Sequence, residues 1–164
     1  MSERLKSPNT AIKCSANLSK CRNYRYSLSR IWAEGPQVLF IMLNPSTADE
    51  HIDDPTIRRC ISFAYSNGFG GITVVNLFAF RSSSPKDLKL QSDPIGPEND
   101  DWIRSMSECH DVIIAAWGNH GSYMNRGDAI RDKIQNLKCL GMNKSGQPKH
   151  PLYVKGGSPL CQYK

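Results

Sequence analysis

The polar stretch that follows the apolar segment 38–43 contains the residue types best suited to chemistry. It reads Asn44-Pro45-Ser46-Thr47-Ala48-Asp49. The amide of Asn44 can orient a water molecule or hydrogen-bond a substrate, and serine and threonine hydroxyl groups can bind phosphate together with backbone N–H groups. Because proline prevents further strand pairing, we expect Asn44 to stand at the end of a strand within a functional site. In the alternative interpretation, Asn44-Pro45 only forms a turn.

Polar residues also mark the ends of two further apolar segments, 71–78 and 112–117. Asn76 lies near the end of the first segment, and the second runs into Trp117-Gly118-Asn119-His120. In open parallel sheets, ligands bind beyond the carboxyl ends of the strands. We therefore expect these strand ends to meet around one cavity.

Common cofactor and hydrolase motifs are missing from the sequence. It contains no GxGxxG, GxxxxGK[ST], HExxH or GxSxG pattern, and its six cysteines form no CxxC pair. We therefore predict no cofactor and no metal. Two alternatives stay open: a metal or cluster where Cys14 and Cys21 meet, and a metal-assisted hydrolase that uses Asp49, His51 and Asp53.

The composition fits one soluble domain with a basic surface. Lysine and arginine number 21 against 15 acidic residues, which gives a formal net charge of +6. This charge makes nucleic acid a plausible partner, although a basic surface alone would account for it equally well. No apolar run is long enough to cross a bilayer, and residues 1–13 lack the apolar part of a signal peptide. We expect a cytoplasmic location and no membrane partner.

The apolar patterns predict the elements that would position the polar residues. Buried strands are expected over 38–43, 71–78 and 112–117, a short strand near 139–140, and helices over 54–68, 98–109 and 126–137. In the segment 24–29, Tyr24, Tyr26 and Leu28 alternate with Arg25, Ser27 and Ser29, which is typical of a half-buried strand, here placed at an edge.

Alternating strands and helices predict an α/β fold, because each parallel connection needs a crossover. The expected architecture is a three-layer α/β/α sandwich with a central, mainly parallel four-stranded sheet. Residues 1–22 are polar and without clear periodicity, so we predict an N-terminal arm there and a single α/β domain over residues 23–164.

Several stretches of the chain together resemble one family. They are MLNPSTADE, DDPTIRR, GFGGITVVNLFAFR, DPIGPEND, AAWGNHG and KHPLY. The combination is similar to a widespread bacterial and phage family that is catalogued as a domain of unknown function, from about Cys14 onwards. This resemblance by itself implies no activity.

The order of the strand-end motifs is also similar to that of the uracil-DNA glycosylase superfamily. Its members have a strand ending in Asp-Pro or Asn-Pro, a second ending in an asparagine that reads the base, a third ending in Trp-Gly or Leu-Gly, and a final His-Pro-Ser loop. Here Asn44-Pro45, Asn76, Trp117-Gly118 and His150-Pro151 follow in the same order. The resemblance implies a uracil-DNA glycosylase-like fold.

The resemblance also implies a role for each polar residue. Cleavage of an N-glycosidic bond develops positive charge on the sugar and negative charge on the base. Asn44 would orient the attacking water, His150 would stabilise the leaving base, and Asn76 would hydrogen-bond the edge of the base. We therefore predict Asn44 and His150 as catalytic residues.

Other residues are candidates for substrate binding. The predicted set is Pro45, Ser46, Thr47, Asp49, Asn76, Arg81, Trp117, Gly118 and His120. Arg81 and Lys149 could bind phosphates from neighbouring loops. Phe63 or Tyr65 could stack on a base, although their spacing fits a helix core better.

Two departures from the superfamily pattern limit what the resemblance implies. Leu152-Tyr153 replaces a serine-bearing loop after His150-Pro151. The first motif continues as Ser46-Thr47-Ala48-Asp49, where well-studied members have an aromatic residue or a glycine. We predict a uracil-DNA glycosylase-like hydrolase that acts on a modified base in a nucleic acid or in a nucleotide. The expected nucleic acid is DNA rather than RNA. The alternative is a non-catalytic nucleic-acid-binding module of the same fold.

Overall fold

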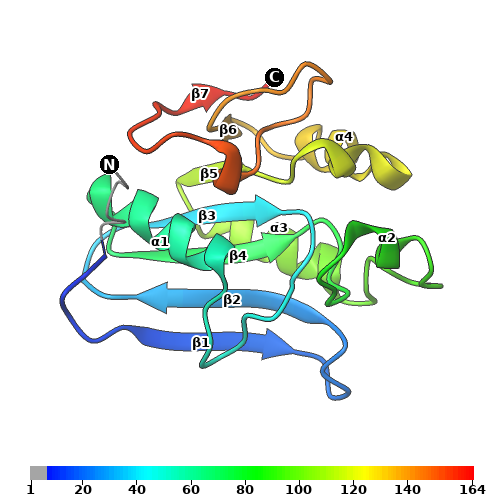
Figure 1. The fold of residues 1–164 in the computed structure, drawn as a ribbon, viewed down its shortest axis with the longest axis horizontal. Helices are drawn as coiled ribbons and strands as arrows, with labels where there is room; N and C mark the ends of the chain where they lie inside the picture. Colours follow the sequence, from blue (N-terminus) through cyan, green and yellow to red (C-terminus); the bar gives the residue numbers. More distant parts are fainter. Residues whose placement is uncertain (1–6) are drawn as a thin grey trace.

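A computed structural model describes residues 7–164 of the chain (Figure 1). In this part of the chain, seven strands form one sheet with the order β1-β2-β4-β3-β5-β6-β7. The strands are β1 (Lys13–Leu18), β2 (Arg25–Ile31), β3 (Gln37–Met42), β4 (Gly71–Asn76), β5 (Val112–Ala115), β6 (Lys138–Cys139) and β7 (Cys161–Gln162). The prediction of a mixed α/β protein is confirmed.

The sheet is larger and more mixed than the mainly parallel four-stranded sheet expected from the sequence. Strands β4, β3, β5 and β6 are neighbours that pair in parallel. In contrast, β1 with β2, β2 with β4, and β6 with β7 pair antiparallel. Antiparallel strands can be joined without a crossover helix. The antiparallel strands therefore do not alternate with helices along the sequence, and the alternation used to predict the sheet did not include them.

The N-terminal arm expected over residues 1–22 was wrong for residues 13–18, which form β1 and pair with β2. Most side chains of β1 are exposed, so backbone hydrogen bonds attach the strand and no apolar pattern marks it. Residues 1–6 of the expected arm lie outside the described residues. Because β1 covers β2, the segment 24–29 is not at the edge of the sheet.

Two predicted helices are confirmed and a third is shorter than expected. The helices are α1 (Pro55–Ser66), α2 (Pro85–Leu88), α3 (Asn99–Glu108), α4 (Arg126–Arg131) and the 3-10 helices η1 (Asn119–Asn125) and η2 (Pro151–Tyr153). As the sequence suggested, Asp54 caps α1, because its Oδ1 accepts from the backbone N–H of Ile57 at 2.9 Å. The helix expected over 126–137 ends early, and Asn136, beyond its end, has a φ of 58° that no helix accommodates.

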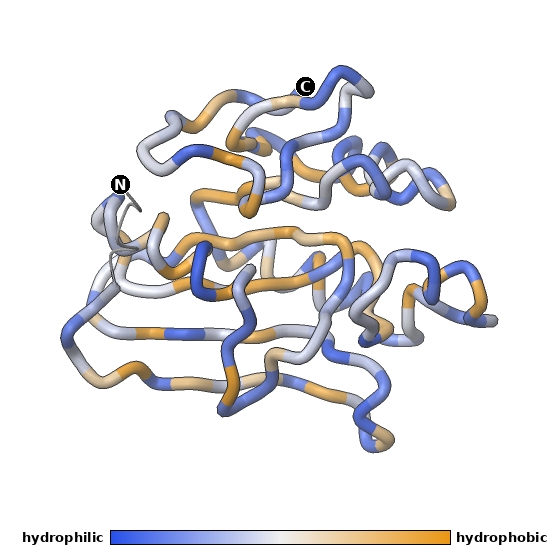
Figure 2. The backbone as a smooth tube through the Cα atoms, in the orientation of Figure 1, coloured by the Kyte–Doolittle hydropathy of each residue, from blue (hydrophilic) through white to orange (hydrophobic). Residues whose placement is uncertain are grey.

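Helices pack on both faces of the sheet. Phe40 of β3 and Val74 of β4 belong to a buried cluster with Ile61 of α1, whereas Ile41 of β3 packs in a second cluster with Ile103 of α3. Successive strand residues point to opposite faces, so the central strands are apolar along their length, as Figure 2 shows. None of the helices in residues 7–164 is long and apolar enough to cross a membrane.

Candidate functional site

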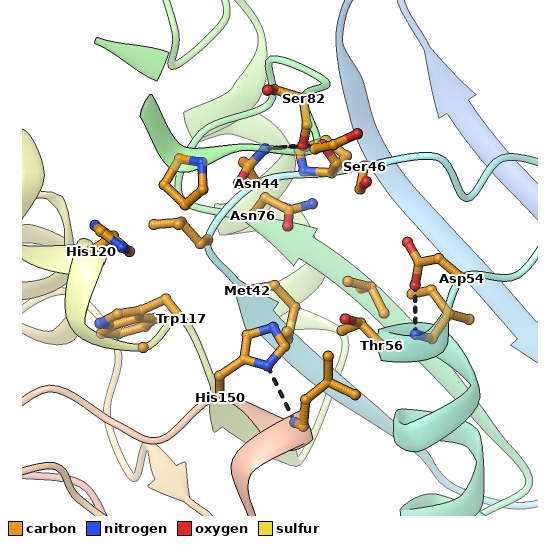
Figure 3. Close-up of a pocket in the computed structure, with 18 of the residues that line it drawn as sticks. Met42, Asn44, Ser46, Asp54, Thr56, Asn76, Ser82, Trp117, His120 and His150 are labelled. Carbon is orange, nitrogen blue, oxygen red and sulfur yellow. Dashed lines mark hydrogen bonds between the residues drawn. The ribbon is translucent and has the colours of Figure 1, made fainter. Parts of the chain in front are cut away.

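A cavity of about 810 Å³ lies at the carboxyl ends of β3, β4 and β5, on the sheet face that α1 covers (Figure 3). Met42 and Asn76, which are paired neighbours at the ends of β3 and β4, form part of its lining. The first turn of α1, the loop after β5 and the helix η2 contribute the rest of the wall. Segments far apart in the sequence therefore converge on one space.

Most of the predicted site residues line this cavity. They are Asn44, Pro45, Ser46, Asn76, Trp117, Gly118, His120 and His150. Thr47, Asp49 and Arg81 are not among the lining residues. The strand-end residues thus lie together, whereas the later part of the 44–49 turn points elsewhere.

The side chain of Asn44 has a defined orientation. Its Nδ2 donates to the backbone oxygen atoms of Pro45, at 3.0 Å, and of Ser82, at 2.9 Å. Because both partners are carbonyl oxygens, the amide nitrogen must face them, and Oδ1 is the atom left for another donor. This arrangement suits an amide that accepts a hydrogen bond from a water molecule.

The side chain of Asn76 is buried in the cavity lining without a hydrogen-bond partner. It is 1% exposed, and neither Oδ1 nor Nδ2 bonds to any described residue. Its backbone is fixed, because the Asn76 oxygen accepts from Asn99 Nδ2 at 2.9 Å and the next N–H, of Leu77, donates to Met42 O at 2.9 Å. A buried amide without hydrogen-bond partners lowers the free energy of unfolding by about 1–3 kcal/mol. Its donor and acceptor are therefore available to a molecule in the cavity.

The ring of His150 is held as a neutral donor. Its Nδ1 accepts from the backbone N–H of Leu152 at 3.2 Å, so the proton of the neutral ring is on Nε2. Burial lowers the pKa of the imidazole below its ordinary value of 6.5, against the opposing attraction of Asp54. Figure 3 shows the second ring nitrogen on the side of Met42, within the cavity. The ring can donate from Nε2 to an atom that gains negative charge.

Trp117 and Gly118 shape the cavity. Trp117 is buried, and its Nε1 donates to Gln147 Oε1 at 2.8 Å, so the indole has no polar group left for a ligand. Gly118 has a φ of 73°, and a Cβ there would lie 3.6 Å from the Cβ of His150. His120 is exposed at the wall. Because Gly118 has no side chain, this turn places main-chain atoms directly beside His150.

The predicted residues outside the cavity stabilise the loop between β3 and α1. Asp49 Oδ1 accepts from the backbone N–H groups of His51 and Ile52, both at 2.8 Å, and these bonds lower the pKa of its carboxyl. Asp53 forms an ion pair with Arg30 at 2.8 Å. The carboxylate of Asp49 is thus used within its own loop, and Thr47 is exposed to solvent outside the cavity lining.

A metal site does not emerge from these residues. Among residues 7–164, no group of three or more His, Cys, Asp or Glu side chains is placed to hold a metal ion. Cys14 and Cys21 are free and exposed. Asp49 and Asp53, the carboxylates considered for a metal-assisted hydrolase, are occupied by backbone N–H groups and by Arg30.

The residues considered for stacking and for phosphate contacts also lie outside the cavity lining. Phe63 packs edge-on against Phe40, with ring centroids 5.9 Å apart, and Tyr65 packs against Trp32 at 6.5 Å. Neither they nor Lys149 line the cavity, and Arg81 donates to the backbone oxygen atoms of Ser46 and Arg22. The helical spacing of Phe63 and Tyr65 had already favoured packing.

Sequence reasoning missed several lining residues. Arg25, Asp54, Thr56, Ser82, Ser83 and Asn143 all line the cavity. Arg25 stood on the polar side of an alternating segment, yet it is 2% exposed. Asp54 was interpreted only as a helix cap, and it caps α1 while facing the cavity. The sequence carried no signal for the serines, because loop residues have no periodicity to interpret.

The model of one protein family, described as "Protein of unknown function (DUF1643)", matches residues 25–152. This range covers more than half of the 164 residues, and it includes all the residues that line the cavity except Tyr153. No curated protein matches the chain, and no solved structure matches it.

Proposed function

The chain belongs to the DUF1643 family, and we propose that it hydrolyses the N-glycosidic bond of a nucleobase in DNA or in a nucleotide. One observation carries this proposal: Asn44, Asn76 and His150 line a single cavity. Each offers a different free group, namely an acceptor, an amide edge and a neutral donor. These are the groups that base release by water requires.

The reaction assigns one step to each side chain. Asn44 Oδ1 accepts a hydrogen bond from the water that attacks the anomeric carbon of the sugar. As the bond between this carbon and the base nitrogen breaks, its electron pair leaves with the base. His150 donates from Nε2 to the base, whose negative charge it stabilises. The oxygen that has added to the sugar then loses one proton to solvent and keeps the other, and the base anion takes up one proton from solvent. The products are a sugar with a hydroxyl group and a free base.

Asn76 supports recognition of a nucleobase. A side-chain amide has an acceptor and a donor side by side, and base edges carry the complementary pair. Because both groups of Asn76 are buried and unpaired among the described residues, a ligand that lacks this pair leaves them unsatisfied. Such a site discriminates strongly against the wrong ligand.

The rim of the cavity supports a nucleic-acid substrate. Leu152 is 47% exposed and Tyr153 is 82% exposed, and both line the cavity beside His150. Exposed apolar and aromatic side chains next to a base pocket can fill the space that a flipped base leaves in a duplex. They stand where the superfamily pattern has a serine-bearing loop, and the net charge of +6 favours binding to a polyanion.

The test is release of free base from oligonucleotides and nucleotides that carry a panel of modified bases, measured by liquid chromatography and mass spectrometry. We expect release by the wild-type protein, and a loss of at least about 100-fold in Asn44→Ala and in His150→Ala. His51→Ala, a substitution of an exposed histidine outside the cavity, should retain the rate, as should the wild type with a chelator. Unchanged release in both cavity variants would rule the proposal out.

The alternative function predicts a different result. A non-catalytic nucleic-acid-binding module would show salt-dependent binding without product, and Asn44→Ala and His150→Ala would bind as the wild type does. The net charge of +6 is the observation that favours it. Measuring binding beside base release separates the two functions.

A further inference from the structure

Arg25, at the start of β2, is a buried positive charge in the cavity lining. It is 2% exposed and lines the cavity. Its Nη1 donates to the backbone oxygen of Ala48 at 3.0 Å. Its Nε is buried without any hydrogen-bond partner, and no carboxylate of residues 7–164 forms an ion pair with it.

The guanidinium remains charged in this position. Burial lowers the pKa of Arg25 to about 10, which is still well above neutral pH. Charges of both signs surround it: Asp54 and Asp49 attract it, whereas Arg81 and Arg30 repel it. An uncompensated buried charge destabilises a protein, so a contribution to folding does not explain why Arg25 is here.

The unpaired edge of Arg25 has the geometry of an anion site. Nε and Nη2 form one side of the guanidinium, and neither donates to a described residue. This edge can bind a phosphate or carboxylate through two parallel hydrogen bonds. Ser46 and Ser83 line the same cavity, and their hydroxyl groups form no hydrogen bond with the described residues, so they can complete the set of donors.

We infer that Arg25, with Ser46 and Ser83, binds a phosphate group of the nucleotide whose base enters the cavity. The ligand is thus a phosphorylated nucleoside unit, either a free nucleotide or one nucleotide of a strand, and not a free nucleoside. The choice of a nucleotide rests on the proposed function. The anion site itself rests only on the burial, charge and missing partners of Arg25.

The first test is binding of inorganic phosphate and of 2′-deoxynucleoside 5′-monophosphates, measured as an increase in Tm, since a ligand that binds only the folded state stabilises it. We expect protection of the wild type and of Arg58→Met, which removes an exposed arginine outside the cavity lining. Arg25→Met should lose this protection, with affinity at least tenfold lower. Equal protection of Arg25→Met and the wild type would overturn the inference.

Without any ligand, Arg25→Met should melt at the same temperature as the wild type or higher, because it removes an unpaired buried charge. A Tm several degrees lower would instead assign Arg25 a structural role. Should this variant fail to fold, Arg25→Lys keeps the charge without the paired donors, and weaker protection by phosphate is expected. In the wild type, the Nε–H resonance of Arg25 should shift as phosphate is added, and an unchanged resonance would contradict the inference.

Two further ligands identify the source of the phosphate. Protection by monophosphates but not by matching nucleosides supports the site, and stronger protection by a short single-stranded oligonucleotide assigns it to a strand. Equal protection by nucleosides and monophosphates contradicts it. None of these measurements requires cleavage, so intact phosphate binding without base release would refute only the proposed function.

Discussion

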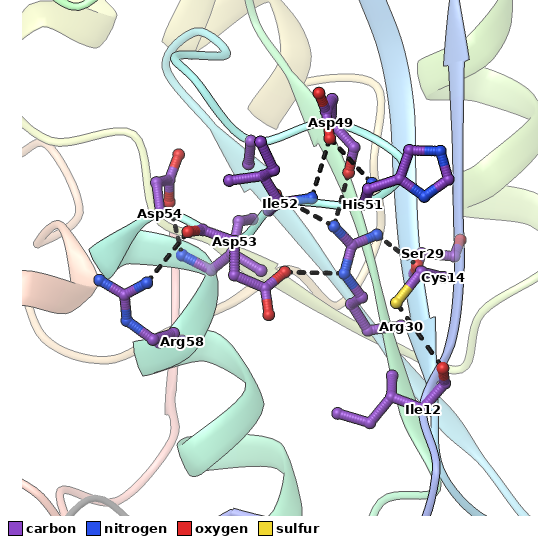
Figure 4. A network of polar contacts seen from close by, with 12 residues as sticks. Ile12, Cys14, Ser29, Arg30, Asp49, His51, Ile52, Asp53, Asp54 and Arg58 are labelled. Atoms are coloured by element: carbon purple, nitrogen blue, oxygen red, sulfur yellow. Dashed lines mark hydrogen bonds and ion pairs between the residues drawn. The ribbon is translucent and has the colours of Figure 1, made fainter.

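Arg25 and Arg30 are two buried arginines on the same strand, β2, with opposite surroundings. Arg30 donates from Nε to Asp53 Oδ1 at 2.8 Å and from Nη2 to the backbone oxygen of Asp49, while Nη1 donates to Ser29 O at 3.0 Å (Figure 4). Arg25 has one hydrogen bond and an unpaired Nε. A satisfied buried arginine organises the loop around it, whereas an unsatisfied one facing a cavity is suited to a ligand.

Two asparagines differ in the same way. Asn99, 0% exposed, donates from Nδ2 to the backbone oxygen atoms of Asn76, at 2.9 Å, and Leu77, at 3.1 Å. Its Oδ1 is buried without a partner, but Asn99 does not line the cavity. In Asn76 both amide atoms are unpaired among the described residues, and the residue lines the cavity. The contrast teaches that burial alone does not separate structural from functional polar residues, and that hydrogen-bond partners and a position at the cavity together do.

The largest effect is expected at Arg30. Arg30→Met leaves Asp53 and several loop carbonyl groups without their donor, so the free energy of unfolding should fall by about 3–5 kcal/mol. The comparison with Arg25→Met, which should lose no stability, is made by urea denaturation of both variants. Similar decreases in the free energy of unfolding in the two variants would contradict the difference inferred between these arginines.

An intermediate effect is expected at the asparagine pair. Asn99→Leu removes donors from two backbone oxygen atoms and should lower the free energy of unfolding by about 1–3 kcal/mol. Asn76→Leu replaces an unpaired amide by an apolar side chain of similar shape and should raise it by about 1 kcal/mol, while base release is lost. Denaturation curves and the base-release assay measure both; destabilisation by Asn76→Leu would show that its amide already has a structural role.

The smallest effect is expected in the pH dependence of stability. Because burial lowers the pKa of His150 below 6.5 in the folded state, the unfolded chain binds this proton more readily. The contribution of His150 to the free energy of unfolding is therefore complete above pH 6.5, and it decreases as the pH falls below this value. Tm measured from pH 7.5 to 5 should decline less steeply in His150→Ala than in the wild type, and parallel curves would contradict a buried neutral ring.

The central elements could be predicted because their signals are local. The continuous apolar runs of β3, β4 and β5, the cap at Asp54 and the spacing of Ile57 and Ile61 each follow from neighbouring residues. The same reasoning failed for β1, whose mostly exposed side chains carry no pattern. It also extended α4 too far, because buried Ile130 and Leu137 fit helical spacing although the chain between them turns.

The candidate site was predictable only at strand ends. Asn44, Asn76 and Trp117 were found because each lies at or next to the end of an apolar segment, and His150 was found only through a family resemblance. Arg25 was missed because the alternation of its segment placed it toward solvent, and Asp49 was assigned to the site although its carboxylate binds its own loop.

The sequence by itself determined which segments form the central strands and which polar residues follow them, since both depend on contacts within a few residues. Only the tertiary structure decided which of those polar groups already have partners. Hydrogen bonds such as Arg30 to Asp53, or Asn44 to Ser82, join segments that are distant in the chain. Whether Arg25 and Asn76 remain unpaired therefore depends on the arrangement of the whole sheet and its loops.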